Sequence, residues 1–179
     1  ACEDALQHNK ALSGSIGAGI GATVGKIYGM ERSSKSGLGV CALEVGDLRV
    51  AAIVVVNALG DICNPENGEK LAGLKTEDGT GFADSREALY TISKRATLFN
   101  SNTTIGVVIT NGEFTKGEMN KLAAMTRNAY ARCIRPVGTM ADGDTIYAAS
   151  VGTVQADINT TGVLMAEAME RAIMRAVTF

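Results

Sequence analysis

Residues 48–58, LRVAAIVVVNA, decide the fold because they contain the longest apolar run of the chain, at about residues 50–56. The centre of this stretch is apolar at every position, which is typical of a strand inside a sheet covered on both faces. Residues 37–44 predict a second strand, and the short turn at Gly46 and Asp47 joins the two strands into a hairpin.

Beyond this hairpin the sequence alternates between helical and extended patterns. The expected elements are a helix over 84–98, a strand over 104–110, a helix over 115–134, a strand over 145–150 and a helix from 159 onward. Thr115 and Glu118 have capping-box spacing, and Asn159 or Thr160 caps the last helix. This order predicts a layered α/β protein in which helices cover the sheet faces.

Two further predictions concern exposure. Residues 61–83 are rich in Asn, Gly, Glu, Lys and Asp, so we expect a long, exposed and mobile loop there. The helical spacing of the last helix places five residues on its buried side, namely Val163, Leu164, Met169, Ile173 and Val177.

The composition is that of one globular domain or of part of one. Of 179 residues, 46% are apolar and 20% are charged, which excludes a largely disordered chain. The formal net charge of −2 argues against nucleic acid as a partner, and the apolar runs are too short for a membrane span. The chain opens with ACEDALQHNK and has no initiator Met, so we expect a fragment or a processed product.

Cysteine and histidine usage limits the possible chemistry. The cysteines have neither zinc-site nor redox-motif spacing, and no signal peptide is visible, so we expect a cytoplasmic protein with buried thiols. His8 is the only histidine of the chain, which excludes a histidine-rich metal site. We expect no catalytic role for His8.

The glycine-rich stretch 13–22 does not match a nucleotide-binding loop. Gly25 and Lys26 are followed by Ile27 instead of Ser or Thr, and the first glycine of a phosphate-binding loop is replaced by Ile20. The dinucleotide fingerprint fails as well, and residues 142–144, DGD, lack the remaining ligands of a calcium loop. We therefore expect neither a metal nor an organic cofactor.

Asn102, Thr103 and Thr104 lie where a polar linker meets the buried strand TIGVVIT. A threonine at such a junction can have its Oγ forced against the preceding carbonyl. Five sequence blocks that include this junction resemble the C-terminal portion of the P1 peptidase family. The blocks are GSIGAGIGATVGK (14–26), VVVNALGD (54–61), SNTTIGVVITN (101–111), KLAAMTRNAYARCIRPV (121–137) and ADGDTIYAAS (141–150). The family includes L-aminopeptidase/D-amidase/esterases, β-aminopeptidases and nylon-oligomer hydrolases.

The resemblance implies a four-layer αββα sandwich of the self-cleaving N-terminal-nucleophile type. On this chain, the family's cleavage would divide a single partial domain, 1–179, into 1–102 and 103–179. The family also implies a homotetramer, and about a hundred further residues before the first block, which are a missing N-terminal segment of the same protein.

The resemblance places the scissile bond between Asn102 and Thr103 and makes Thr103 the nucleophile. Lys26, Asn57, Asp142 and Asp144 correspond to the other active-site residues of the nylon-hydrolase branch. The implied substrates are small peptides or ω-amino-acid amides.

The residue types suit this chemistry. A freed α-amine at Thr103 accepts the proton of its own hydroxyl. The Asn57 amide, with an N–H from the 14–21 loop, stabilises an oxyanion. Two neighbouring aspartates repel, so that one holds a proton, and Lys26 lowers the pKa of the amine. The residues alone also allow a strand-end cap at Asn57, a solvated turn at Asp142 and Asp144, and a plain surface lysine.

Two other functions remain open at this stage. An acyltransferase similar to ornithine acetyltransferase shares a comparable fold and also cleaves itself before a threonine, but its Lys-Gly-Thr-Gly-Met type of motif is absent from this sequence. A cleavage-incompetent chain that serves only as an assembly subunit is the second alternative.

Overall fold

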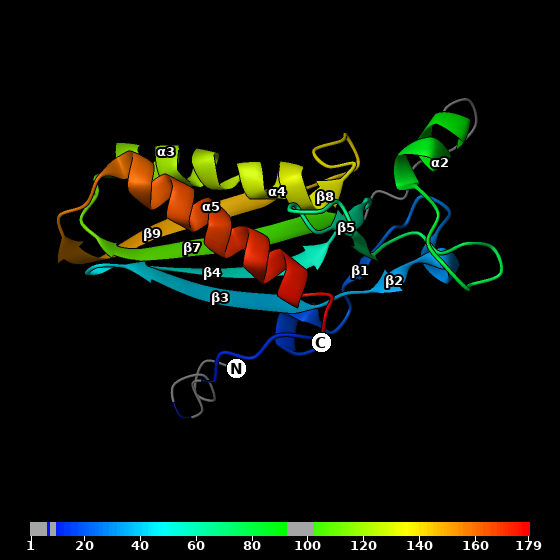
Figure 1. Ribbon diagram of the computed structural model, residues 1–179, viewed down its shortest axis with the longest axis horizontal. Helices are drawn as coiled ribbons and strands as arrows, with labels where there is room; N and C mark the ends of the chain where they lie inside the picture. Colours follow the sequence, from blue (N-terminus) through cyan, green and yellow to red (C-terminus); the bar gives the residue numbers. More distant parts are fainter. Residues whose placement is uncertain (1–6, 8–9, 93–101) are drawn as a thin grey trace.

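The core of the protein is one mixed sheet, seen in a computed structural model that describes residues 7, 10–92 and 102–179. Its strand order is β3-β4-β7-β9. The strands are β3 (Leu38–Val45), β4 (Leu48–Asn57), β7 (Thr103–Gly112) and β9 (Thr145–Val154). β3, β4 and β7 are antiparallel neighbours, whereas β9 runs parallel to β7 (Figure 1). The predicted hairpin is confirmed, and the strand that begins at Thr103 has a neighbour on each side.

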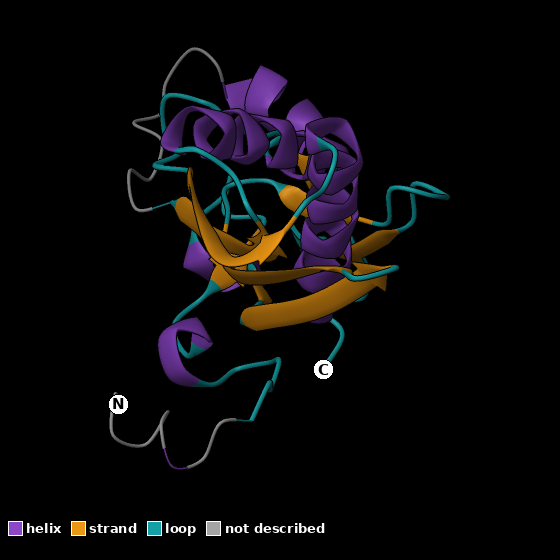
Figure 2. Ribbon diagram, turned by 90° about the vertical axis from the view of Figure 1, so that its left-hand side faces the viewer, coloured by secondary structure: helices purple, strands orange, loops and turns teal. Residues whose placement is uncertain are grey.

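One face of this sheet is covered by helices. α3 (Lys116–Thr126), α4 (Asn128–Cys133) and α5 (Ile158–Arg175) lie together on that face (Figures 1 and 2). Alternate residues of β4 point into the resulting core, because successive side chains of a strand face opposite sides. The buried side chains of β4 are Leu48, Val50, Ala52, Val54 and Val56, which belong to one core cluster with Leu122, Tyr130, Met165, Met169 and Ile173 of the helices.

The opposite face of the sheet is apolar and largely open. Ile105 is 47% exposed, Tyr147 62% and Val151 71%, and Ile53 lies on the same face. Strand pairing aligns Ile53, Val107 and Tyr147 in one row across three strands. The expectation that the central strand is covered on both faces is therefore not met within the described residues, where the helices pack on one face only.

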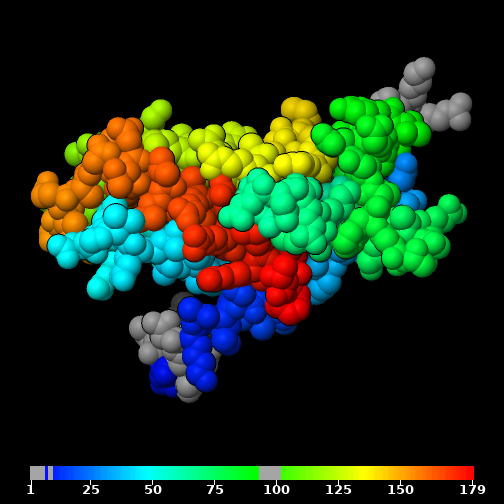
Figure 3. Space-filling view, viewed as in Figure 1, coloured from blue at the N-terminus to red at the C-terminus, as the bar shows by residue number. Residues whose placement is uncertain are grey.

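Shorter elements gather at one end of the sheet, where β4 ends and β7 begins (Figures 1 and 3). They are η1 (Gly17–Gly19), β1 (Thr23–Val24), η2 (Met30–Arg32), β2 (Ser34–Lys35), β5 (Asp61–Cys63), β6 (Lys70–Ala72), α2 (Ser85–Ile92) and β8 (Ile134–Arg135). β1 pairs with β2, and β5 lies between β6 and β8. Among the described residues, no helix is long and apolar enough to cross a lipid bilayer.

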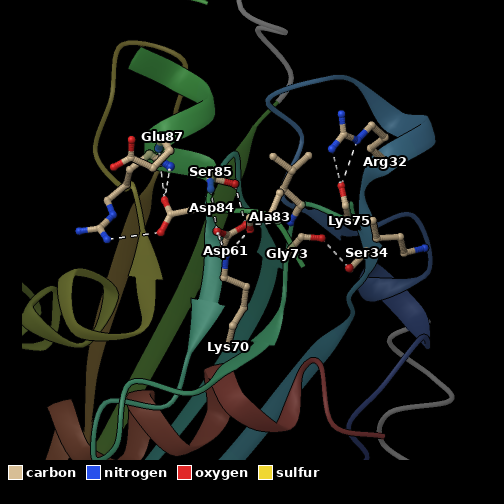
Figure 4. A network of polar contacts seen from close by, with 12 residues as sticks. Arg32, Ser34, Asp61, Lys70, Gly73, Lys75, Ala83, Asp84, Ser85 and Glu87 are labelled. Carbon is tan, nitrogen blue, oxygen red and sulfur yellow. Dashed lines mark hydrogen bonds and ion pairs between the residues drawn. The ribbon is translucent and has the colours of Figure 1, made fainter. Parts of the chain in front are cut away.

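The prediction of an exposed loop over residues 61–83 is confirmed in part: residues 66–69 and 77–82 are exposed, but the segment also contains β5 and β6 and is buried at 61–63 and 72–74. β5 is buried along its whole length, and Asp61 is only 2% exposed. The Asp61 carboxylate pairs with Lys70 Nζ at 2.7 Å and accepts hydrogen bonds from Leu74 N at 2.8 Å and from the Ser85 hydroxyl at 2.6 Å (Figure 4). The prediction is wrong for the buried part because it took polar residues as exposed, while here a single carboxylate satisfies several buried donors.

The helix predictions are right in type and differ at the ends. The capping box of Thr115 and Glu118 is confirmed. The helix predicted over 115–134 is interrupted at Arg127, between α3 and α4. The last helix is capped by Asp157, whose side chain accepts from Thr160 N at 2.8 Å, and Val163 is 65% exposed instead of buried. The predicted helix beyond residue 92 and the predictions for His8 lie outside the described residues.

Candidate active site

The predicted cleavage junction lies at the first residue of β7. The Thr103 hydroxyl donates a hydrogen bond to the carbonyl oxygen of Asn102 at 2.5 Å. The same carbonyl accepts a hydrogen bond from Gly143 N at 2.9 Å. The expected contact between the threonine hydroxyl and the preceding carbonyl is therefore present, and a backbone donor polarises that carbonyl from a second direction.

Gly143 is a functional candidate that the sequence analysis did not identify. A Cβ atom built on Gly143 would lie 2.8 Å from Thr103 Oγ1 and 3.7 Å from the Asn102 carbonyl oxygen. A side chain at this position would therefore press on the predicted nucleophile. The glycine in the middle of the DGD stretch was the available signal, although glycine in a turn is too common to indicate such a role by itself.

Lys26 reaches the site from a tight turn. Gly25 has φ +72°, a left-handed conformation that favours glycine, and its backbone packs on Gly73 and Leu74. Gly25 N donates to Gly60 O, and Lys26 N donates to Leu59 O, each at 2.9 Å. These two hydrogen bonds fix the turn just beyond the end of β4.

The Lys26 side chain is buried, with 2% exposure, and ends at Asn57. Lys26 Nζ donates to Asn57 Oδ1 at 2.7 Å and to Asn57 O at 3.1 Å. Burial lowers the pKa of Lys26 from 10.5 to about 8, and the negative charge of Asp142 opposes part of that shift. A plain surface lysine is therefore excluded, and the amine titrates close to neutral pH.

Asn57 is the last residue of β4 and the strand partner of Thr103 in the β4–β7 register. Its side-chain oxygen accepts from Lys26 Nζ and also from Thr23 N, at 3.2 Å. Asn57 therefore links the lysine turn to the strand that carries the predicted nucleophile. The expected oxyanion donors are the Asn57 amide and an N–H of the 14–21 loop, whereas the backbone N–H that contacts the junction carbonyl belongs to Gly143.

The two predicted aspartates, Asp142 and Asp144, contact the residues on either side of Thr103. Asp142 is paired with Asn102 in an isolated parallel bridge, and its carboxylate accepts from the N–H and the hydroxyl of Thr139 at 2.9 and 2.7 Å. Asp144 Oδ1 accepts from Thr104 N at 2.8 Å. Both carboxylates therefore have specific partners within the fold, which argues against a merely solvated turn.

The electrostatic environment distinguishes Asp144. Burial raises the pKa of the Asp144 carboxyl, and the charge of Asp142 raises it further, while the hydrogen bond from Thr104 N opposes both effects. The buried Tyr130 hydroxyl lies between the starts of β7 and β9, 3.5 Å from Thr104 O and 3.4 Å from Thr145 O. Burial, with a contribution from Asp144, raises the pKa of Tyr130, which therefore stays neutral.

The structure thus brings all six predicted site residues together at one end of the sheet. They come from the Gly25–Lys26 turn, the end of β4, the start of β7 and the segment before β9. Thr103 and Asn57 belong to the same face of the sheet as Val55 and Ile105, which is the open apolar face. The site is therefore located at the edge of that face.

The chain matches the model of a known protein family. The model of peptidase family S58 matches residues 1–179. An uncharacterized aminopeptidase of Mycobacterium leprae is 33% identical over 155 residues, which cover 80% of this chain and 38% of the relative. A 6-aminohexanoate-oligomer endohydrolase of Kocuria sp. is 32% identical over 151 residues, which cover 83% of this chain and 41% of the relative. The chain therefore spans less than half the length of these two relatives.

The fold is also similar to that of a solved aminopeptidase. The L-aminopeptidase D-Ala-esterase/amidase of Ochrobactrum anthropi, described as a variant of the Ntn hydrolase fold, superposes with a TM-score of 0.59. The sequence identity is 16%, and the match covers 92% of this chain and 44% of that structure. At this identity the likeness concerns the fold alone.

Proposed function

The chain belongs to peptidase family S58, and on this premise we propose that it is part of a hydrolase of peptide or amide bonds that cleaves itself before Thr103. The observation that supports this proposal best is the position of the Asn102 carbonyl. It lies between the Thr103 hydroxyl, at 2.5 Å, and Gly143 N, at 2.9 Å. A nucleophile and a stabilising donor thus converge on one peptide bond.

The proposed self-cleavage proceeds in two steps. Thr103 Oγ1 attacks the Asn102 carbonyl carbon, the C–N bond between the two residues breaks, and the hydroxyl proton ends on the nitrogen of Thr103. The result is an ester between Asn102 and Thr103. Water then hydrolyses this ester, which yields a carboxylate on Asn102 and restores the Thr103 hydroxyl beside a free α-amine.

Lys26 is suited to receive the hydroxyl proton during self-cleavage. With a pKa of about 8, roughly a tenth of its amine is unprotonated at pH 7, far more than for an ordinary lysine. It is bonded to Asn57, the strand partner of Thr103. Negative charge develops on the carbonyl oxygen of Asn102 during the attack, and Gly143 N already donates a hydrogen bond to that oxygen.

After cleavage, the α-amine of Thr103 takes over as the base. Such an amine has an ordinary pKa of about 7.7–8.0 and lies next to the hydroxyl that it activates. Asp144 accepts from the neighbouring N–H of Thr104, and we assign to it the positioning of the strand end that carries this amine. We assign to the Asn57 side chain the binding of the substrate carbonyl.

The open sheet face is the place where we expect the rest of the protein. Its exposed apolar side chains, Ile53, Ile105 and Tyr147, match the inner surface of a two-sheet sandwich. The relatives contain more than half of their length outside the matched region. We therefore propose that a segment absent from this chain adds a second sheet there, which completes a four-layer αββα sandwich and encloses the site.

The names of the relatives suggest the substrate class. One is called an aminopeptidase and another an endohydrolase of 6-aminohexanoate oligomers. We propose small peptides or ω-amino-acid amides as substrates of the whole protein. We further expect a cytoplasmic homotetramer, which the sedimentation equilibrium of the full-length protein tests.

Intact-mass spectrometry of the full-length protein tests the proposed function. We expect the wild-type protein to separate into two chains, of which the smaller begins at Thr103. Thr103→Ala removes the nucleophile and leaves a single chain. Thr103→Ser retains a hydroxyl and is the matched control, so it is expected to cleave.

A wild-type precursor that stays intact after prolonged incubation contradicts the proposal and supports the alternative of a non-catalytic assembly subunit. Cleavage before Thr103 without hydrolysis of any aminoacyl p-nitroanilide supports self-processing and contradicts the proposed hydrolysis of small amide substrates.

A further inference from the structure

The side chain of Asn102 occupies a defined and buried position. Asn102 is 2% exposed, and its Nδ2 donates to the carbonyl oxygen of Ala141 at 3.3 Å. Its backbone pairs with Asp142, and its own carbonyl accepts from Gly143 N. Three consecutive residues, 141–143, therefore hold the side chain, the backbone and the reacting carbonyl of one amino acid.

A single nucleophile implies a single position for the carbonyl that it attacks. In self-cleavage that carbonyl belongs to Asn102, and in later reactions it belongs to an external substrate. Catalysis requires the reacting atoms to be aligned closely, because a displacement of about 1 Å can cost a factor of about 10² in rate. The acyl residue of a substrate must therefore take the place of Asn102 after the processed chain end withdraws.

We propose that the position of the Asn102 side chain is the acyl-residue subsite of the enzyme, and that the Ala141 carbonyl selects a short acyl group with an N–H donor attached to its γ atom. This inference rests on the proposed function and specifies its substrate class. Asparaginyl amides meet the requirement directly. Amides of 4-aminobutyrate also meet it, because their amine is bonded to the γ carbon.

The chemistry of Ala141 gives the subsite its selectivity. Ala141 is a buried residue, and a substrate that lacks an N–H donor leaves its carbonyl without the hydrogen bond that Asn102 supplies. Leucine has nearly the same shape as asparagine but offers no donor. An aspartyl substrate should fit the subsite least well, because its carboxylate oxygen and the Ala141 carbonyl oxygen are both acceptors and repel each other. The expected order of acyl residues is therefore Asn, then Leu, then Asp.

The test uses the same three side chains in two independent settings. In the first, the processed wild-type full-length protein is given p-nitroanilides of Asn, Leu, Asp and 4-aminobutyrate. We expect kcat/KM to be about tenfold higher for Asn and 4-aminobutyrate than for Leu, which corresponds to one buried hydrogen bond. In the second, the half-time of self-cleavage is measured for the wild type, Asn102→Leu and Asn102→Asp.

Agreement between the two orders supports a shared subsite, which a purely structural role of Asn102 does not produce. Equal or faster hydrolysis of the leucine substrate overturns the inference, even where self-cleavage and hydrolysis both occur and the proposed function stands. A precursor that does not cleave and hydrolyses none of the anilides overturns the proposed function together with the inference. The substrate series uses only the wild type, so poor folding of a variant does not affect it.

Discussion

Two buried clusters near one end of the sheet each contain a lysine and at least one aspartate, yet they are organised differently. In the Asp61 cluster, Lys70 Nζ lies 2.7 Å from the carboxylate, whose oxygens also accept from Leu74 N and from the N–H and hydroxyl of Ser85. In the Thr103 cluster, Lys26 donates instead to two neutral oxygens of Asn57.

This difference separates a structural cluster from a reactive one. Asp61 is surrounded by donors that stabilise its charge, and it anchors the start of α2 at Ser85 and the chain at Leu74 (Figure 4). Around Thr103, burial lowers the pKa of Lys26 and raises the pKa of Asp144, so both groups approach the range in which they exchange protons. The arrangement of partners, more than the residue types, distinguishes the proposed active site from the structural cluster.

The largest expected effect on folding is in the Asp61 cluster. Asp61→Ala removes the counter-charge of Lys70, whose Nζ keeps only the Ala83 carbonyl as acceptor, and leaves the buried donors of Ser85 and Leu74 without their acceptor. We expect the free energy of unfolding of the full-length protein to fall by about 3–5 kcal/mol. Urea denaturation measures this loss. A decrease below about 1 kcal/mol would show that the cluster is not the structural anchor described here.

Asp61→Asn is the matched variant, because it keeps oxygen acceptance at one position and removes the charge. We expect it to lie between the wild type and Asp61→Ala in stability.

A large effect on self-cleavage with little effect on folding is expected at Gly143. In Gly143→Ala the new Cβ lies 2.8 Å from Thr103 Oγ1 and displaces the nucleophile. We expect self-cleavage to slow by about 10²-fold, as for a misplaced reacting group. Time-resolved gel electrophoresis of the full-length protein follows the reaction.

Gly117→Ala is the control for this variant, because a Cβ at Gly117 of α3 meets open space. Its cleavage rate should match that of the wild type. Equal rates for the two alanine variants would exclude the close approach at Gly143 as a requirement.

A moderate, pH-dependent effect on stability is expected at Lys26. Its pKa is about 8 in the folded protein and 10.5 in the unfolded chain, so the unfolded chain binds more protons between these values. The contribution of Lys26 to the free energy of unfolding therefore increases as the pH rises from about 8 to 10.5. Lys26→Met removes this increase, which urea denaturation across that pH range measures. A constant difference between the two proteins over the range contradicts the lowered pKa.

The smallest expected effect is a shift in a single pKa. Asp142 raises the pKa of Lys26 through its charge, so Asp142→Asn should move that pKa further below its wild-type value. An NMR titration of the Lys26 side chain measures the shift. Asp47→Asn, in the turn at the far end of β4, is the control and should leave the pKa unchanged. A shift in the opposite direction would contradict the proximity of Asp142 to the lysine.

Local sequence patterns predict some elements of the fold well but do not predict the site. The hairpin of β3 and β4, the β7 strand and the capping box follow from local patterns, because apolar periodicity and cap chemistry act over a few residues. The site residues were identified through the family resemblance, since Lys26 and Asp142 lie far apart in the chain and only tertiary packing joins them. The resemblance supplied what local reasoning lacks.

The errors have a common physical origin. The buried Asp61 was taken as a loop residue because polar composition indicates exposure on average and gives no information about specific donors. Asp157 was overlooked as the cap of α5, although Asn159 and Thr160 belong to the same short polar run. Gly143 was missed because the need for glycine at this position comes from the nearby Thr103 side chain, which leaves no room for a Cβ atom. The local sequence contains no information about that tertiary contact.

The position of the junction within the sheet determines what a broken chain would look like. β4 precedes the junction and β7 follows it, and the two strands are paired from Val50 with Thr110 to Asn57 with Thr103. α5 likewise packs on β3 and β4 from the other side of the cut. The two products would thus share one β-sheet and one hydrophobic core. We expect them to unfold together as a single cooperative unit. Scission before Thr103 would change the connectivity of the molecule, while the two chains would stay paired in one sheet until the entire domain unfolds.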